Sequence, residues 1–460
     1  MKAGRSLPAG MMDAGLASVS TFAVGVYAAR SLAAGDLGLF ALHFSAFLLV
    51  STLSHQGLFI PLEARAAASD QPLQFARRSL SLTWIPIVLA PGVLVLGRVA
   101  APGTVPVTLG LSAAAAVALS PLQDHMRRLL HLMGRSWSAV GVSVVQAVTV
   151  GAAVLVLHGR LDPLLIPFAA LASANLASSA AASGLIGWRL TQEPGSGTDT
   201  RLPGARALLG SGRWLLGAQL SAAAAAFLAA TAVGRLGSME ALGLADAARI
   251  VARPVLVLTT GMTAVLGPQL MRAGVTGEEK AGRRVGSLYR RTIALSVTAY
   301  VLFFGWNHGL NPLAWLVPAA YQIPLLVLAT CAANGLVGSV IPARFEAIGA
   351  GRARSLMRVD RLAGGAQVAS AALAGITQAF AIPLGSALFA LMRRRGLRGV
   401  RSEVYRPGSD ARGPGSSQAS GRAVGPPVAR SVPPEGASPA REPDSVAGEP
   451  AEAPCPVQVG

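Results

Sequence analysis

Charged residues are scarce in this 460-residue chain. Aspartate, glutamate, lysine and arginine together make up 13% of it, about half of the ~25% that is usual in soluble domains. Aromatic residues are also few, at 5%, whereas hydrophobic residues reach 52%. A water-soluble protein of this length could not cover its surface with so few charges. The composition therefore excludes an ordinary soluble protein and indicates a membrane protein.

Cysteine and the usual catalytic signatures are nearly missing as well. The two cysteines are Cys331, in an apolar run, and Cys455, in a polar segment, which excludes a disulfide framework. The six histidines are scattered, and no Cys/His group has the spacing of zinc ligands. The chain contains neither a Gly-x-x-x-x-Gly-Lys-Ser/Thr phosphate loop nor a nucleophile turn. We therefore expect no metal site, no cofactor and no enzymatic activity.

The chain is rich in positive charge and in long apolar runs. Its 39 lysines and arginines exceed its 21 acids by 18, which indicates either a nucleic-acid partner or the cytoplasmic loops of a membrane protein. A membrane-spanning helix needs about 20 apolar residues. Many runs approach or exceed that length, which favours a lipid bilayer over nucleic acid as the partner. These runs are residues 13–30, 37–60, 79–97, 99–123, 136–157, 163–188, 214–234, 242–271, 292–343 (long enough for two helices) and 362–392.

The placement of the basic residues predicts the number and orientation of the spans. Lysines and arginines concentrate in alternate loops, as cytoplasmic loops do under the positive-inside rule. Eleven spans would put Arg393, Arg394 and Arg395 outside, whereas twelve keep them inside. We therefore predict an all-α polytopic membrane protein with twelve spans and both termini in the cytoplasm. The only basic residues in the predicted external loops are Arg30, Arg98, Arg160 and Arg235. The basic residues assigned to the cytoplasmic loops include Arg127, Arg128 and Arg344.

A repeated mark divides the predicted spans into two halves. Residues 30–39 begin with Arg and end with Leu-Gly-Leu, and so do residues 235–244, at a constant offset of 205. The mark opens the second and the eighth span, which indicates two parallel lobes of six helices. The predicted organisation is a lobe over residues 1–190, a cytoplasmic linker over 191–203, a lobe over 204–398, and a disordered Pro/Gly-rich cytoplasmic tail over 399–460.

The first spans of each half carry a family resemblance. Ala29-Arg30-Ser31-Leu32, Asp36 and Gly38-Leu39-Phe40-Ala41 lie in the first half, and Arg235-Leu236, Arg253-Pro254 and Pro268-Gln269-Leu270 lie in the second. With the surrounding sequence they resemble polysaccharide-biosynthesis and O-antigen-type flippases of the multidrug/oligosaccharidyl-lipid/polysaccharide (MOP) superfamily, whose fold is MATE-like. The resemblance covers residues 11 to about 395. It implies two lobes around a central cavity, alternating access, and export of a lipid-linked sugar.

Three ionisable residues in the predicted eighth span are the main candidates for substrate binding. Asp246, Arg249 and Arg253 follow the spacing i, i+3 and i+7, which places them on one face of a helix. Ionisable groups inside a bilayer are costly and usually face a cavity. Two guanidinium groups could hold a substrate diphosphate, with Asp246 pairing with Arg249 when the site is empty. Alternatively, the span begins near Pro254 and the three residues form an external interfacial turn.

Other polar residues in the spans allow a chemical and a structural interpretation. His43 and His55 are candidates for proton coupling, although a single helix histidine is more often packed. Asp13 is a candidate for binding a coupling ion, and an N-cap at the cytoplasmic interface is the expected alternative. Gln146, Asn175 and Gln219 could bond a sugar or another helix, and bonding between helices is the expectation.

The sequence therefore predicts a flippase in the inner (plasma) membrane of a bacterium. Its substrate would be a polyprenyl-diphosphate-linked oligosaccharide, and a polysaccharide polymerase or glycosyltransferases would be its protein partners. The alternative is a multidrug or small-solute exporter of the MATE or major-facilitator type. Residues 61–79 lack the Asp-Arg-x-Gly-Arg loop of the major-facilitator proteins. A membrane-embedded glycosyltransferase or polymerase would need large external loops, and those loops are short here.

Overall fold

The computed structural model describes residues 7–67, 75, 79–192, 204–304 and 317–405. All of them belong to one compact unit, Met1–Asp410. Most of the predicted linker, residues 193–203, and the tail from residue 406 onward lie outside the described residues. The last described helix ends at Val404, so it continues past residue 399, where the sequence analysis placed the start of the tail.

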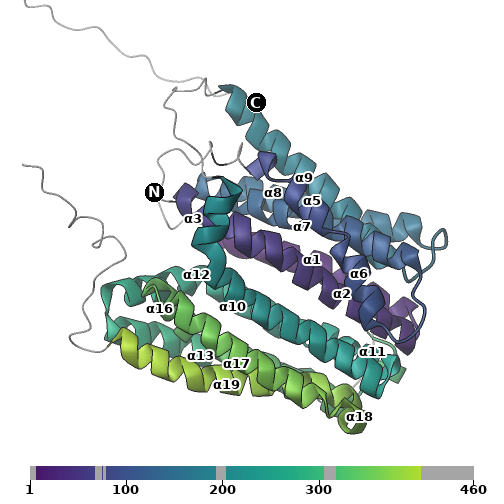
Figure 1. Ribbon diagram of the computed structural model, residues 1–460. Coiled ribbons are helices and arrows are strands. Elements are labelled where there is room, and N and C mark those ends of the chain that lie inside the picture. Colours follow the sequence, from purple (N-terminus) through teal and green to yellow (C-terminus); the bar gives the residue numbers. More distant parts are fainter. Residues whose placement is uncertain (1–6, 68–74, 76–78, 193–203, 305–316, 406–460) are drawn as a thin grey trace, which may run out of the picture. The chain divides into compact units, whose positions relative to one another are not determined.

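Every regular element among the described residues is a helix (Figure 1). Several predicted spans are built from two or three helical pieces. The first half contains α1 (Leu7–Ser31), α2 (Ala34–Ser54), the π-helical turn η2 (His55–Phe59), α3 (Ile60–Ala67), α5 (Trp84–Leu89), α6 (Gly92–Ala100), α7 (Val107–Leu132), α8 (Ser136–Leu157) and α9 (Ile166–Gln192).

The second half repeats this pattern of long and broken helices. It contains α10 (Ala205–Ala232), η3 (Val233–Gly237), α11 (Met239–Val251), α12 (Arg253–Thr276), α13 (Glu279–Phe304), η4 (Ala319–Tyr321), α15 (Pro324–Ser339), α16 (Ile341–Gly349), α17 (Ala353–Ala371), α18 (Ala374–Thr377), η5 (Gln378–Phe380) and α19 (Ala381–Val404).

The described helices bear out a polytopic membrane protein. Eight segments are long and apolar enough to cross a membrane, and a ninth is added if the two parts of α12, bent by 50°, form one span. The count of twelve spans and the position of the termini remain predictions. Large apolar side chains such as Leu155 and Ile376 are 80% and 85% exposed. Side chains of this kind on an outer surface are typical of contact with lipid.

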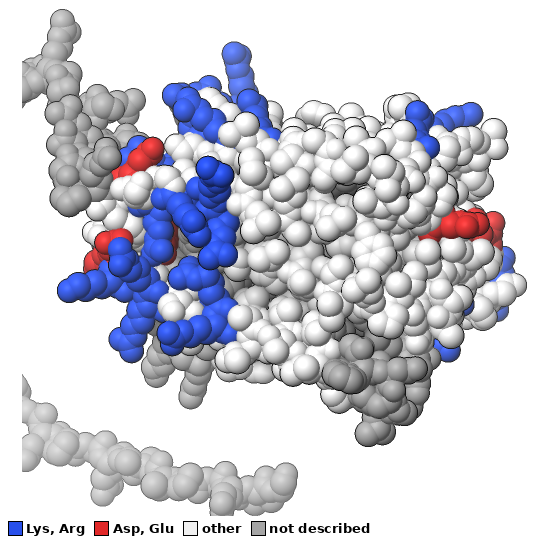
Figure 2. All heavy atoms as spheres, turned by 90° about the horizontal axis from the view of Figure 1, so that it is seen from below, with Lys and Arg blue, Asp and Glu red and all other residues white. Residues whose placement is uncertain are grey.

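Charge is distributed unevenly over the surface. On the face shown in Figure 2, lysine and arginine side chains gather toward one end, and a broad band without charged residues separates them from the opposite end. A band of this kind is what a hydrocarbon layer about 30 Å thick requires. The surface therefore agrees with a membrane-embedded middle and a basic end.

The two halves meet where their repeated Leu-Gly-Leu marks cross. Helices α2 and α11 pack closely, and a Cβ atom on Gly38 would overlap the carbonyl oxygen of Met239. In the same way a Cβ atom on Gly243 would overlap the carbonyl oxygen of Ala34. The offset of 205 relates Gly38 to Gly243 and Ala34 to Met239, so the two contacts are equivalent and the crossing is symmetrical. Only glycine allows two backbones to approach this closely, which explains why glycine lies at the centre of both marks.

Candidate functional site

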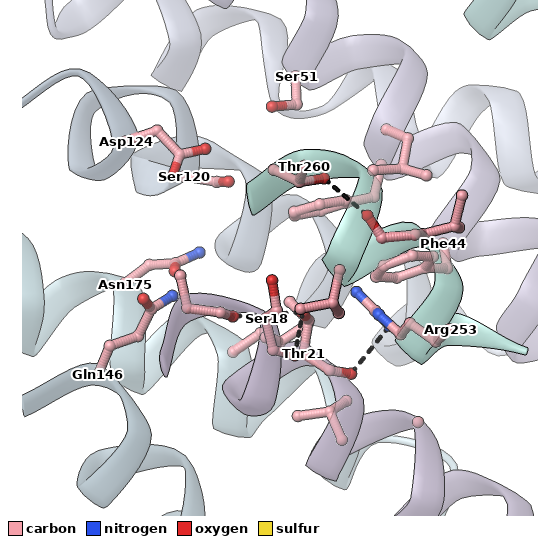
Figure 3. Close-up of a pocket in the computed structure, with 18 of the residues that line it drawn as sticks. Ser18, Thr21, Phe44, Ser51, Ser120, Asp124, Gln146, Asn175, Arg253 and Thr260 are labelled. Atoms are coloured by element: carbon pink, nitrogen blue, oxygen red, sulfur yellow. Dashed lines mark hydrogen bonds between the residues drawn. The ribbon is translucent and has the colours of Figure 1, made fainter. Parts of the chain in front are cut away.

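A cavity of about 440 Å³ lies between helices of the two halves (Figure 3). Its wall is formed in the first half by α1, α2, α7, α8 and α9, and in the second half by α11 and α12. Its size lies within the ~300–1,000 Å³ range of small-ligand pockets. The polar and charged side chains of the wall are Ser18, Thr21, Ser51, Ser120, Gln123, Asp124, Arg127, Gln146, Asn175, Asp246, Arg249, Arg253 and Thr260.

The three residues predicted to bind substrate all line this cavity. Asp246 and Arg249 lie on α11, and Arg253 is the first residue of α12, after a break at Ala252. Because α11 begins at Met239, a helical segment precedes Pro254 and carries two of the three residues. The structure therefore places all three residues on the wall of the cavity between the halves.

The contacts of these residues leave part of their bonding capacity open. The Nη2 atom of Arg249 lies 2.5 Å from Oδ1 of Asp246, which is 3% exposed. Arg249 also lies over the ring of Phe44, at 5.6 Å from its centroid. The Nη1 atom of Arg253 donates to the carbonyl oxygen of Thr21 at 3.1 Å, as Figure 3 shows. A guanidinium group has five N–H donors, so both arginines retain donors for a ligand.

The charge balance of the cavity wall favours an anion. Three arginines (Arg127, Arg249 and Arg253) and two aspartates (Asp124 and Asp246) line it, which leaves a net positive charge. Arg127 lies 3.5 Å from Asp124 and 3.3 Å from Asp13, a buried acid behind the wall, and Arg249 pairs with Asp246. Arg253 therefore differs from the other two, because its hydrogen bond goes to the backbone carbonyl of Thr21 and not to an acid.

His43 and His55 do not line the cavity. His43 is buried, its Nδ1 lies 2.9 Å from the carbonyl oxygen of Leu39, and its ring fills the space beside Gly97. These contacts are those of a packed histidine. His55 begins the π-helical turn η2, and its buried Nδ1 has no hydrogen-bond partner among the described residues.

Asp13 does not cap a helix, so that interpretation is wrong. Helix α1 begins at Leu7, and the Asp13 carboxylate is buried against α7 and α8. It accepts a hydrogen bond from Ser143 at 2.5 Å, and it lies 3.0 Å from Nε2 of His131 and 3.3 Å from Nε of Arg127. The cap was expected because the first charged residue before an apolar run often marks a helix start.

A second polar cluster, at the end of α7, was not predicted from the sequence. The predicted span stopped at residue 123, and Arg127 and Arg128 were assigned to a loop, but α7 continues to Leu132. Both ring nitrogens of His125 on this helix are hydrogen-bonded. Its Nε2 lies 2.5 Å from Oγ of Ser79, and its Nδ1 lies 2.9 Å from Oε1 of Glu63. Arg128 donates to the other oxygen of Glu63 at 3.1 Å.

A signal for this cluster was present in the sequence. Asp124, Arg127 and His131 repeat the spacing i, i+3 and i+7 of Asp246, Arg249 and Arg253. The partners that satisfy these charges, Asp13 and Glu63, come from α1 and α3. Contacts so distant in sequence do not follow from local spacing, which is why the charges were interpreted as cytoplasmic loop residues.

Three side-chain amides, from Gln123, Gln146 and Asn175, also line the cavity. Bonding between helices was expected for Gln146, Asn175 and Gln219, and all three make such bonds. Gln123 donates to Gln146 across α7 and α8 at 3.1 Å, and Asn175 donates to the carbonyl oxygen of Ala116 at 2.8 Å. Gln219 lies elsewhere and accepts from Arg344 at 2.8 Å. Among the described residues, no group of three or more His, Cys, Asp or Glu side chains could hold a metal ion.

Two further arginines assigned to loops are inside the second half. Arg393 is 5% exposed, and its Nε lies 2.8 Å from Oδ1 of Asp360, which is fully buried. Arg344 lies on α16 beside Gln219. These arginines therefore contribute to packing between helices and not to the charge of a loop.

No family model and no curated protein sequence matches the chain. Solved structures do match its fold. The outward-facing form of a multidrug resistance MATE family transporter of the MOP superfamily has a TM-score of 0.59 at 16% identity, over 87% of this chain and 94% of that one. The inward-facing form of such a transporter has a TM-score of 0.53 at 19% identity, over 88% and 95%.

The chain has the fold of the MOP transporters. A third structure with this fold, a MOP superfamily transporter from Pyrococcus furiosus, has a TM-score of 0.58 at 15% identity, over 87% of this chain and 95% of that one. It is described as having a binding pocket of reverse polarity that suggests a different function. The MOP fold thus spans nearly the full length of these transporters, and the cavity of this chain lies between its two halves.

Proposed function

We propose that the chain flips a polyprenyl-diphosphate-linked oligosaccharide across a bacterial plasma membrane by alternating access. The observation that carries the proposal is the net positive cavity between the halves, with Arg249 and Arg253 on its wall. A diphosphate is the charged group that every such lipid shares. Guanidinium groups bind phosphate oxygens in a bidentate manner and keep their charge at any physiological pH. The lipid tail would stay in the bilayer while the head group occupies the cavity.

In this mechanism the diphosphate competes with Asp246 for Arg249. The empty site keeps Arg249 paired at 2.5 Å, which limits the cost of a buried charge. A bound phosphate provides a better partner, because it carries more negative charge and more acceptor oxygens. The two halves would then rock about the linker over residues 191–203 and expose the head group on the other side. Glycosyltransferases would act before this step and a polysaccharide polymerase after it.

The coupling ion is proposed to bind at Asp13. This carboxylate is buried beside His131 and Arg127, and Arg127 also lines the cavity. A proton or a cation bound at Asp13 would therefore weaken its hold on an arginine of the substrate cavity. His43 and His55 remain candidates of lower rank because, among the described residues, neither forms a hydrogen bond or ion pair with a side chain that lines the cavity.

A multidrug exporter of the MATE type is the second candidate. It is supported equally by the fold, since two of the matched structures are multidrug resistance MATE transporters. A cationic drug, however, requires acids that are free to pair with it. Here Asp246 is paired with Arg249 and the wall is net positive, so the cavity itself favours the anionic lipid.

Reconstitution separates the two candidates. The full chain is inserted into liposomes, which are supplied either with a fluorescent polyprenyl-diphosphate disaccharide or with the cationic dye ethidium. The proposal predicts that the lipid changes leaflets faster than in empty liposomes and that ethidium is not transported. Transport of ethidium without movement of the lipid would overturn the proposal in favour of the exporter.

A further inference from the structure

The cavity has a second polar region that the diphosphate does not use. We call this region the carboxamide cluster. It consists of Gln123, Gln146 and Asn175, which come from α7, α8 and α9 of the first half. Gln146 and Asn175 lie on the side of the cavity opposite Arg253 (Figure 3). The wall is therefore cationic where the second half contributes, whereas the first half contributes amides beside the pair of Asp124 and Arg127.

The carboxamide cluster is buried but keeps unfilled bonding capacity. Gln123, Gln146 and Asn175 are 2%, 5% and 3% exposed. Each side-chain amide has two donor hydrogens and an acceptor oxygen. Among the described residues, the cluster makes one internal hydrogen bond and one bond to a backbone carbonyl. The amide nitrogen of Gln146 and the oxygens of Gln123 and Asn175 have no partner in those bonds.

The free atoms of the cluster are not sealed from the cavity, so a ligand with several hydroxyl groups can bond them in place of water. We propose that the carboxamide cluster binds the sugar nearest the diphosphate. This inference rests on the proposed function. A hydroxyl both donates and accepts, as an amide does, and the cluster adds no net charge that would require a charged sugar. The cavity volume of about 440 Å³ accommodates a diphosphate with its proximal sugar, and the remaining sugars extend beyond it.

One ligand would then contact both halves of the protein. The diphosphate binds Arg249 and Arg253 in the second half, and the proximal sugar binds the carboxamide cluster in the first. A lipid diphosphate that has lost its sugar contacts only the second half. The carboxamide cluster would thus distinguish the loaded carrier from the empty one. A site built to hydrogen-bond a substrate hydroxyl discriminates strongly against an analogue without it.

The test compares binding of sugar-bearing and sugar-free lipids to the full chain in detergent. The probes are one short-chain polyprenyl diphosphate without sugar and the same lipid bearing glucose, galactose or N-acetylglucosamine. We expect at least one sugar-bearing probe to bind on the order of 10-fold or more tightly than the bare lipid, since each net hydrogen bond contributes about that factor. Equal affinity for the bare lipid and all three sugar-bearing probes would overturn the inference.

Variants of the chain test whether the carboxamide cluster is the source of the preference for the sugar-bearing lipid. Gln146→Leu with Asn175→Leu should remove the preference for the sugar-bearing probe and leave affinity for the bare lipid unchanged. Gln146→Met preserves the volume of the side chain and should also reduce this preference. It provides the test if the double variant does not fold. Gln367→Leu removes a buried amide that does not line the cavity and should change neither affinity. An equal loss for both lipids in the cluster variants would contradict the inference. Failure of the unaltered chain to bind any lipid diphosphate would instead refute the proposed function.

Discussion

At the residue scale, the charges inside this protein are paired in a way that makes each of them sensitive to loss of its partner. Asp360 is fully buried and holds Arg393, which is 5% exposed, at 2.8 Å. Removing one member of a buried pair leaves the other charge without compensation. The pairs in the cavity wall follow the same rule, but they are expected to exchange partners with a ligand.

We predict that Asp360→Ala lowers the free energy of unfolding by about 3–5 kcal/mol. Glu279→Gln is the matched control, because Glu279 pairs with Arg283 on an exposed helix surface and such pairs contribute about 1 kcal/mol or less. Both variants are compared by denaturant unfolding in detergent. Equal effects of the two substitutions would show that the pair between Asp360 and Arg393 is not buried.

A second prediction at this scale concerns Asp13. Asp13→Asn keeps the size of the side chain but removes the charge that holds His131 and Arg127. If Asp13 binds the coupling ion, lipid movement in proteoliposomes should lose its response to an imposed proton or sodium gradient. The variant's transport without a gradient is measured beside it. A gradient response equal to that of the unaltered chain would place the coupling site elsewhere.

At the scale of elements, the sequence predicted that α2 and α11 are equivalent helices of two halves, but not that they cross. The repeated Leu-Gly-Leu marks at a constant offset predicted equivalent positions, and the structure brings Gly38 and Gly243 to the same crossing. The end of α7 was not predictable in the same way. Its charges are satisfied by Asp13 and Glu63 from distant parts of the chain, and a local pattern of charge next to an apolar run is typical of a loop.

The close contact of α2 and α11 predicts how two glycine-to-alanine substitutions change the stability of the protein. Gly243→Ala places a Cβ atom against the backbone of Ala34, and such overpacking typically costs ~1–3 kcal/mol of stability. Gly35→Ala is the control, because a Cβ atom there meets nothing within 4 Å and alanine is favoured over glycine in a helix by ~0.5–1 kcal/mol. Thermal unfolding in detergent should therefore shift in opposite directions. A shift in the same direction would contradict close contact at the crossing.

At the scale of the whole molecule, the sequence predicts more than the described helices establish. Twelve spans with both termini inside follow from the positive-inside rule, whereas eight or nine helical segments meet the length and hydropathy requirements of a span. Burial explains part of the difference, because inward-facing charges such as the fully buried Asp360 lower the apolarity of α17, which is packed inside the protein but is not among those segments. The cavity residues of the second half were predictable from one helix, but the carboxamide cluster is assembled from three.

Orientation is tested by chemical labelling of single cysteines in intact cells. The starting chain carries Cys331→Ser and Cys455→Ser. A cysteine at position 160 should react with a reagent that does not cross membranes, and one at position 284 should not. The reverse pattern would place the basic loops outside the cell.

The central claim is that the cavity arginines bind the diphosphate of a lipid-linked sugar. The most direct measurement is the rate at which a fluorescent polyprenyl-diphosphate disaccharide changes leaflets in liposomes containing Arg249→Gln with Arg253→Gln. Arg284→Gln, on an exposed surface of α13, is the matched control. The account predicts that the double variant inserts normally but loses nearly all transport, while the control retains it. Normal transport by the double variant would contradict the account.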